Sequence, residues 1–287
     1  MIDYFIAGIR KGLRLHRPGR SLLILPDDIF LVSFPKSGNT WSRFLLANLL
    51  HPEQPATFAN IHRLIPDPTG TTKKDFDRMP RPRIIKSHEC FDPRYKRVIY
   101  IVRDPRDVAV SQYHYHRKLM RITDDSPIEN FVTRFLAGET CPHGSWGQNV
   151  ASWLATSEKD PRFLWLRYED MVEDTARELK KIVTFLGLSA TVDQIAEAVE
   201  RSSAASMRNL EKAQTDQCEL TKGSRKDLSF VRSAGSGGWR SELPVSQVSR
   251  IEGAWGSLMR HVGYELSLRS VLEKSDSSYL GILSKTP

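Results

Sequence analysis

The sequence predicts an α/β fold: a single domain in which helices flank a central, mainly parallel sheet. Three observations support this. Short apolar runs rich in Ile, Val, Phe and Tyr are each followed by a polar turn, as buried parallel strands are. Helical patterns come between and after these runs. Finally, no internal repeat or low-complexity linker divides the 287 residues.

The predicted elements alternate along the chain. Strands are expected over residues 29–34, 83–86, 98–102 and 163–168. Helices are expected over 40–50 and 170–188, where apolar residues recur at helical spacing, and Gly187 lies near the end of the second. Thr191 and Gln194 form a capping box that opens a further helix.

Two segments differ from this pattern. Residues 211–238 are polar, poor in aliphatic side chains and rich in glycine near their end, so we predict a mobile lid there. Residues 1–27 are basic, and we expect them to pack on the domain formed by residues 28–287. Their basic residues follow the apolar ones, which is the wrong order for a signal peptide. A weak contact with a membrane surface and a plain packing helix both remain open.

Composition narrows the range of partners and compartments. The net charge of +8 favours anionic partners without choosing among nucleotides, nucleic acids and membranes. Three widely spaced cysteines without a CxxC motif argue against a disulfide framework and against a cysteine zinc site, and they favour a cytoplasmic location. No stretch approaches the roughly 20 apolar residues of a transmembrane helix.

The turn "PKSGNT" lies between the first predicted strand and the first predicted helix. The first N–H groups of a helix lack partners and carry partial positive charge, so this turn can bind an anion. Lys36 adds a full charge, Gly38 lets the backbone approach the ligand, and the short polar side chains are Ser37, Asn39 and Thr40. Lys36 precedes the glycine, so the turn is not a Walker A loop. Taken alone, it is also compatible with a helix cap and an incidental lysine.

Basic groups follow two further strands. "IIKSHE" places Lys86 and His88 after the second strand, and "YIVRDPRDVAVSQYHY" places Arg103 after the third, with Ser111 in the following helix. Ligands of open α/β sheets bind outside the carboxyl ends of the strands. Near the C-terminus, "FVRSAGSGGWR" joins Arg232 to a glycine-rich run.

Together these motifs resemble the PAPS-dependent sulfotransferase family, most closely its cytosolic small-molecule type, from about residue 28 to 260. The resemblance implies a P-loop-like phosphosulfate-binding loop. It also implies transfer of the sulfuryl group from PAPS to a hydroxyl or amine of a small molecule, without a metal and without a nucleic acid partner. No convincing set of metal ligands appears in the sequence.

The resemblance also assigns roles to residues. The loop from Lys36 through Ser37, Gly38, Asn39 and Thr40 corresponds to the phosphosulfate loop. The remaining implied donor contacts are Trp41 and Tyr168 at adenine, Arg103, Ser111 and Arg232 at the 3′-phosphate, and Ser202. The chain departs from the family at Ser233-Ala234, where Lys-Gly is usual, and at Ala204, where a second aromatic usually flanks adenine.

The implied chemistry is in-line displacement. His88 would remove the acceptor proton, since an imidazole with a pKa near 6.5 suits a general base. Lys36 would stabilise charge on the leaving phosphate oxygen. Lys86 lies two residues before His88, so in an extended chain both side chains share a face, and Lys86 would steady the sulfuryl oxygens.

Alternatives remain at this point. A P-loop-type kinase or NTPase would need a Walker A lysine, and a nucleotide- or RNA-binding module would not need His88.

The acceptor is expected to contact residues 51–82, 140–153 and 211–230. A small alcohol, phenol or amine is the first choice of acceptor, and a glycolipid or sugar hydroxyl is the second. Trp146 fits a pocket wall or the core. The family's dimer signature is largely missing from residues 240–249, so we predict a monomer or weak dimer.

Overall fold

The computed structural model describes residues 22–68, 71–214 and 223–267. Most of the predicted N-terminal segment, for which a membrane-surface contact is left open, and residues 215–222 of the predicted lid lie outside these ranges.

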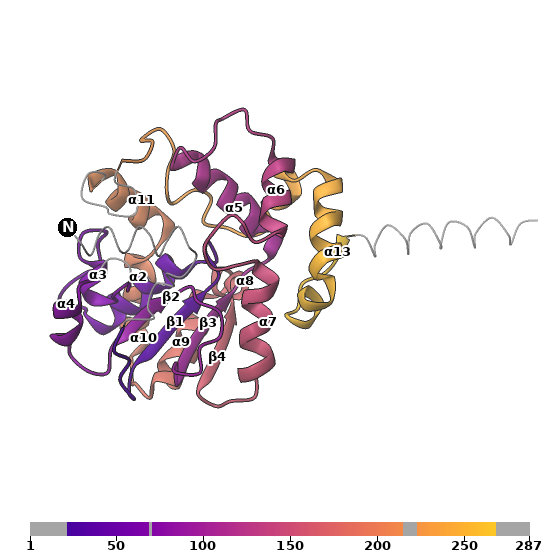
Figure 1. The fold of residues 1–287 in the computed structure, drawn as a ribbon. Helices are drawn as coiled ribbons and strands as arrows, with labels where there is room; N and C mark the ends of the chain where they lie inside the picture. Colours follow the sequence, from indigo (N-terminus) through magenta and orange to yellow (C-terminus); the bar gives the residue numbers. More distant parts are fainter. Residues whose placement is uncertain (1–21, 69–70, 215–222, 268–287) are drawn as a thin grey trace, which may run out of the picture.

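A four-stranded parallel sheet forms the centre of the domain, in the order β2-β1-β3-β4 (Figure 1). The strands are β1 (Ile29–Ser33), β2 (Ile84–Ser87), β3 (Arg97–Val102) and β4 (Phe163–Arg167). Each agrees with its predicted range to within a residue at either end. The predicted α/β fold with a central parallel sheet is therefore confirmed.

Twelve helices are labelled in the ranges that the structure describes. They are α2 (Asn39–Leu50), α3 (Ile61–Leu64), α4 (Lys73–Asp77), α5 (Pro105–Lys118), α6 (Ile128–Leu136), α7 (Trp146–Ser157), α8 (Tyr168–Glu173), α9 (Thr175–Leu186), α10 (Val192–Arg201), α11 (Ala204–Ala213), α12 (Trp239–Glu242) and α13 (Val245–His261). The capping box at Thr191 opens α10 as predicted. The single helix predicted over 170–188 is wrong, because Asp174 interrupts it and accepts a hydrogen bond from the Arg177 amide to cap α9.

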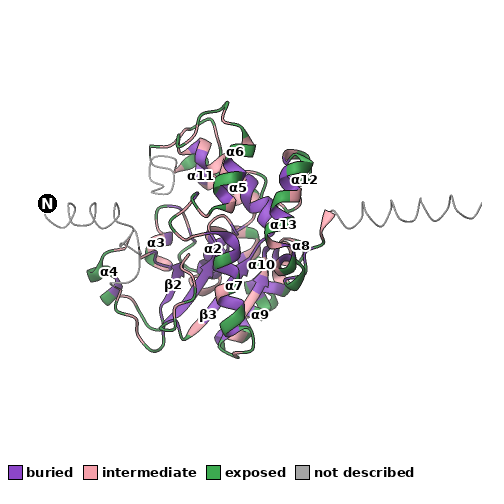
Figure 2. Ribbon diagram, turned by 45° about the vertical axis from the view of Figure 1, so that its right-hand side comes forward, coloured by how far each residue is buried: buried purple, intermediate pink, exposed green. Residues whose placement is uncertain are grey.

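The sheet is buried on both faces, which explains its continuous apolar strands (Figure 2). Successive residues of β1 point to opposite sides. Phe30 and Val32 belong to a core completed by residues of α5, α6, α7 and α13. Ile29 and Leu31 belong to a second core with α2, α9 and α10. The molecule is thus a three-layer sandwich.

The parallel register brings the carboxyl ends of three strands to one edge of the sheet. Val32 pairs with Ser87 of β2 and with Tyr100 of β3. The segments that leave these strands begin at Phe34, His88 and Arg103. The predicted basic groups therefore emerge beside one another.

Candidate active site

The turn between β1 and α2 has an unusual backbone. Lys36 and Gly38 have φ angles of 72° and 96°, in the left-handed region that disfavours residues with a Cβ. A Cβ at Gly38 would lie 2.5 Å from the Cδ2 of Tyr168. The Ser37 hydroxyl is buried without a hydrogen-bond partner among the described residues. The turn thus packs tightly against Tyr168 and retains an unsatisfied polar group.

The ammonium group of Lys36 lies against two aromatic rings. Its Nζ is 4.3 Å from the ring centre of Tyr115 and 4.5 Å from that of Phe230. Burial, and then the positive charges of Arg103 and Arg232, lower the pKa of Lys36 to about 7. Binding of an anion at this position would restore the full charge of the lysine.

Arg103 ties the turn to the glycine-rich segment that precedes α12. Its Nη1 donates to the Lys36 carbonyl at 3.1 Å, and its Nη2 donates to the Gly235 carbonyl at 3.0 Å. The guanidinium carbon lies 4.2 Å from the ring centre of Tyr168. The Nε of Arg103 is buried without a partner in the part of the chain described, so one donor remains for a ligand.

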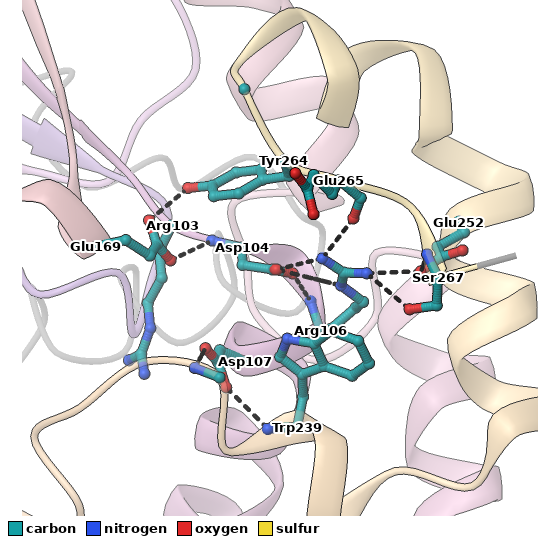
Figure 3. A network of polar contacts seen from close by, with 12 residues as sticks. Arg103, Asp104, Arg106, Asp107, Glu169, Trp239, Glu252, Tyr264, Glu265 and Ser267 are labelled. Carbon is teal, nitrogen blue, oxygen red and sulfur yellow. Dashed lines mark hydrogen bonds and ion pairs between the residues drawn. The ribbon is translucent and has the colours of Figure 1, made fainter. Parts of the chain in front are cut away.

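A buried polar network fixes the start of α5, immediately after Arg103 (Figure 3). Arg106 bridges Asp104 and Glu252 of α13, with shortest N–O distances of 2.6 Å in both pairs. Glu169 accepts hydrogen bonds from the Asp104 amide at 3.0 Å and from the Tyr264 hydroxyl at 2.8 Å. Burial raises the pKa of Glu169. These contacts lock the end of β3 against α8 and α13.

Asp107 connects the same helix to the glycine-rich segment (Figure 3). Its carboxylate accepts from the amides of Gly237 at 2.6 Å and Trp239 at 3.0 Å. This places Gly235 where its carbonyl meets Arg103. Residues 235–239 are therefore positioned by hydrogen bonds to their backbone, which explains why glycines suffice there.

His88 follows β2 and has a defined tautomer. Its Nδ1 lies 2.7 Å from the Ser33 carbonyl, which can only accept, so Nδ1 carries the proton and Nε2 is the basic nitrogen. Burial, and then the neighbouring Lys86 and His143, lower the pKa of His88 well below its usual value. The imidazole is therefore neutral at physiological pH.

Lys86 is the third predicted catalytic group. Its Nζ forms an ion pair with Asp67, and both side chains are almost fully buried. Burial lowers the pKa of Lys86, and the carboxylate of Asp67 opposes this effect. Sequence reasoning missed Asp67, because an isolated aspartate in a loop gives no signal.

Two cavities meet at these groups. The larger cavity, of about 400 Å³, lies over the turn between β1 and α2, and the smaller cavity, of about 320 Å³, lies over the segment after β2. Both are lined by Pro35, Lys36, Lys86, His88 and Tyr115, which we call the shared wall. All three predicted catalytic residues belong to this wall.

Most predicted donor contacts gather at the larger cavity. Its lining includes Lys36, Gly38, Asn39, Thr40, Trp41, Arg103, Ser111, Tyr168 and Arg232. The rings of Trp41 and Tyr168 meet edge to face, with centroids 5.7 Å apart. Arg232 donates to Glu242 at 2.7 Å. Val172, Val199 and Met207 provide apolar surface near Ala204, where the expected aromatic is missing.

Two predicted donor contacts do not line the cavity. Ser37 belongs to the turn but is fully buried. Ser202 is fully buried: its hydroxyl accepts from Asn48 at 2.9 Å, and its carbonyl accepts from the indole N–H of Trp41 at 3.0 Å. The structure places Ser202 as a support for Trp41, and the neighbouring Ser203 reaches the cavity.

Trp146 is also resolved. It is fully buried in the core, and its indole N–H donates to the Arg103 carbonyl at 3.0 Å. Trp146 is therefore a core residue and not part of a pocket wall.

Phe230, which covers Lys36, is held by a residue that sequence reasoning missed. The carboxylate of Glu211 accepts from the amides of Phe230 at 2.6 Å and Val231 at 3.0 Å. Lys118 donates to the Arg225 carbonyl at 3.0 Å from α5. Glu211 thus ties the two ends of the described part of the predicted lid to each other, and Lys118 attaches that part to α5.

Among the described residues, no cluster of three or more His, Cys, Asp or Glu side chains is arranged to hold a metal ion. In the same ranges, no helix combines the length and the apolar character needed to span a bilayer.

Comparisons with known proteins agree with the geometry. The family model described as a sulfotransferase domain matches residues 26–263. Sulfotransferase 1A1 from Bos taurus is 32% identical over 262 residues, covering 84% of this chain and 86% of that protein. Sulfotransferase 1E1 from Bos taurus is 29% identical and covers 77% of this chain and 79% of that protein.

Solved structures show the same fold. The crystal structure of mouse sulfotransferase SULT7A1 complexed with PAP superposes with a TM-score of 0.65 at 28% identity, covering 88% of this chain and 89% of that one. Retinol dehydratase in complex with androsterone and inactive cofactor PAP gives a TM-score of 0.67 at 20% identity, covering 85% and 83%. At 20% identity, the similarity to retinol dehydratase supports the fold alone. With a family model that spans most of the sequence, the chain belongs to the sulfotransferase family, as its four motifs predict.

Proposed function

We propose that the protein transfers the sulfuryl group from PAPS to a hydroxyl or amine of a small molecule, with His88 as general base. The observation that carries this proposal is the shared wall. Lys36, Lys86 and His88 border both cavities, so a group held in the larger cavity can be passed to an acceptor in the smaller one. Family membership favours this function over a kinase, an NTPase or a binding module.

The larger cavity suits PAPS. Arg103 lines this cavity, and its unsatisfied Nε calls for a partner of the kind that a phosphate oxygen supplies. A side chain at Gly38 would collide with Tyr168, so the glycine lets the turn and this ring form the cavity wall together. The corner formed by Trp41 and Tyr168 offers aromatic surface to adenine. The structure of the mouse relative complexed with PAP supports the same donor.

Three residues then perform the chemistry. The Nε2 of His88, left basic by the bond from Nδ1 to Ser33, takes the proton of the acceptor hydroxyl. Lys36, fully protonated beside the anion, stabilises the charge that develops on the leaving phosphate oxygen. Lys86, held by Asp67, contacts the sulfuryl oxygens in transit.

Other expectations drawn from the sequence remain predictions. The domain division at residues 27 and 28, the mobility of residues 211–238 and the monomeric or weakly dimeric state are predictions. A cytoplasmic location is proposed from the cysteine pattern; both cysteines that the structure describes, Cys90 and Cys141, are thiols.

A transfer assay tests the function. Full-length protein with radiolabelled PAPS is offered alcohols, phenols, amines, sugars and glycolipids, and thermal unfolding is followed with and without PAP. PAP should raise the unfolding midpoint by mass action. His88→Ala should lower kcat by about 10² to 10⁴ and keep the response to PAP. The matched control is His261→Ala, since His261 is half exposed and lies outside both cavities. An equally active His88→Ala variant would show that His88 is not the base.

A further inference from the structure

The smaller cavity has an unusual lining for a small-molecule site. Such sites are lined mainly by hydrophobic and aromatic side chains. Here, among the described residues, the lining contains no Leu, Ile, Val, Met, Phe or Trp. Apart from three prolines, one cysteine and the two tyrosines, every lining side chain is charged, an imidazole, an amide or a hydroxyl.

Two polar atoms around the smaller cavity lack partners. The Oε1 of Glu89 and the Nδ1 of His143 are buried and form no hydrogen bond within the described ranges. Glu89 and His143 face each other at 3.5 Å, which is too long for a good hydrogen bond. Buried polar atoms without partners are costly, so the site is suited to a ligand that supplies them.

The charges of the lining decide the kind of polar ligand. Lys36, Lys86 and Arg121 are basic, whereas the carboxylates are Asp67 and Glu89. Asp67 is already paired with Lys86. With the donor bound, Lys36 faces the phosphosulfate and Arg121 is balanced by Glu89, so the lining offers no net attraction to a cationic amine. A neutral hydroxyl needs no counter-charge, since it donates to a carboxylate and accepts from an ammonium, a guanidinium or an imidazole N–H.

We propose that the acceptor is a neutral polyhydroxyl compound, such as a sugar or cyclitol, and that Glu89 and His143 bind a hydroxyl neighbouring the one that reacts at His88. The rings of His88 and His143 have centroids 5.6 Å apart, which leaves adjacent hydroxyls of one small ring within reach of both. This inference rests on the proposed sulfuryl transfer and selects among its acceptors. An apolar phenol or steroid would leave the same polar groups unpaired.

The experiment compares polyhydroxyl acceptors with apolar and cationic ones. With saturating PAPS, kcat/KM is measured for phenyl glucoside, methyl glucoside and inositol, and for naphthol, hexanol and cyclohexylamine. We expect the polyhydroxyl compounds to exceed the others by at least tenfold. Higher kcat/KM values for naphthol, hexanol or the amine would overturn the inference.

Two variants test whether Glu89 and His143 determine the selectivity for acceptors. Glu89→Gln keeps the shape of the side chain but removes the negative charge, and it should lower the ratio of kcat/KM for phenyl glucoside to that for naphthol about tenfold, mainly through KM. His143→Phe should lower the same ratio by making the wall apolar. The control is Glu53→Gln, which alters an exposed glutamate outside both cavities. An unchanged ratio in both variants contradicts the assignment of Glu89 and His143.

The outcome separates this inference from the proposed function. If PAP raises the unfolding midpoint and naphthol is sulfated in preference to the glucosides, the function stands and the acceptor assignment fails. If PAP has no effect on unfolding and no compound is sulfated, the proposed function fails and the acceptor assignment fails with it.

Discussion

The larger and smaller cavities share a wall but come from different kinds of sequence. The larger cavity is built from a helix start, strand ends and the aromatic corner of Trp41 and Tyr168, and each of these belongs to a compact motif. The smaller cavity is lined by single residues of several loops, among them Asp67, Glu89 and His143. The residues of the larger cavity can therefore be recognised from motifs, whereas those of the smaller cavity are brought together only by folding.

The difference leads to separable mutational effects. Changes confined to the larger cavity should alter donor binding equally for all acceptors, and changes confined to the smaller one should alter the ranking of acceptors. Changes in the shared wall should reduce the rate of transfer to every acceptor.

The largest effect is expected in the shared wall, at Lys36. Lys36→Met removes the cation beside the leaving phosphate oxygen and keeps much of the side-chain volume, so kcat should fall by about 10² to 10³. Steady-state assays with a sugar and with a phenol should show the same loss. The control is Lys96→Met, at an exposed lysine bonded to the Pro93 carbonyl. A loss confined to one acceptor would contradict a shared wall.

An intermediate effect is expected in the larger cavity, at Gly38. Gly38→Ala combines a left-handed backbone with a clash against Tyr168, so calorimetry should show PAP affinity reduced by about 10- to 100-fold. Gly187→Ala is a matched control, because Gly187 has a φ of 69° and a Cβ there meets nothing within 4 Å. That variant should show the backbone cost alone, about 1 to 2 kcal/mol in the free energy of unfolding, with PAP affinity unchanged. Equal PAP affinity in both variants would exclude the close packing at Gly38 as a requirement for donor binding.

The smallest expected effect is the uptake of protons when PAP binds. The pKa of free Lys36 is about 7, and a bound anion raises it, so PAP binding at pH 7 should take up about half a proton. Above pH 7 the free lysine loses its proton and PAP affinity should fall, by up to about tenfold per pH unit. Calorimetry in buffers of different ionisation enthalpy measures the uptake. Lys36→Met should lack this component; identical uptake in the variant would assign it to another group.

The sequence predicted the sheet well because its strands are buried on both faces and therefore form unbroken apolar runs. It predicted one helix over residues 170–188 because apolar spacing continues across Asp174, and only the side-chain cap reveals two helices. Nine of the eleven donor contacts that the motifs predict line the larger cavity.

Other functional features could not be predicted, and the reason is physical. Ser202 belongs to a motif-like stretch, but tertiary packing turns its hydroxyl toward Asn48. Glu211, Glu89 and Asp67 look like ordinary surface carboxylates in the sequence. Folding places them against backbone amides, an imidazole and a lysine respectively. Such partners are far apart in the chain, so no local pattern marks them.

The aromatic contacts of Lys36 have a consequence for the arrival of the donor. Lys86 is paired with Asp67 and Arg232 with Glu242, whereas no ion pair to Lys36 occurs in the described ranges. An incoming phosphosulfate group therefore does not have to displace a carboxylate from Lys36 among the described residues. When the donor binds, Lys36 only takes up a proton. Donor binding is therefore not slowed by the breaking of a salt bridge at Lys36.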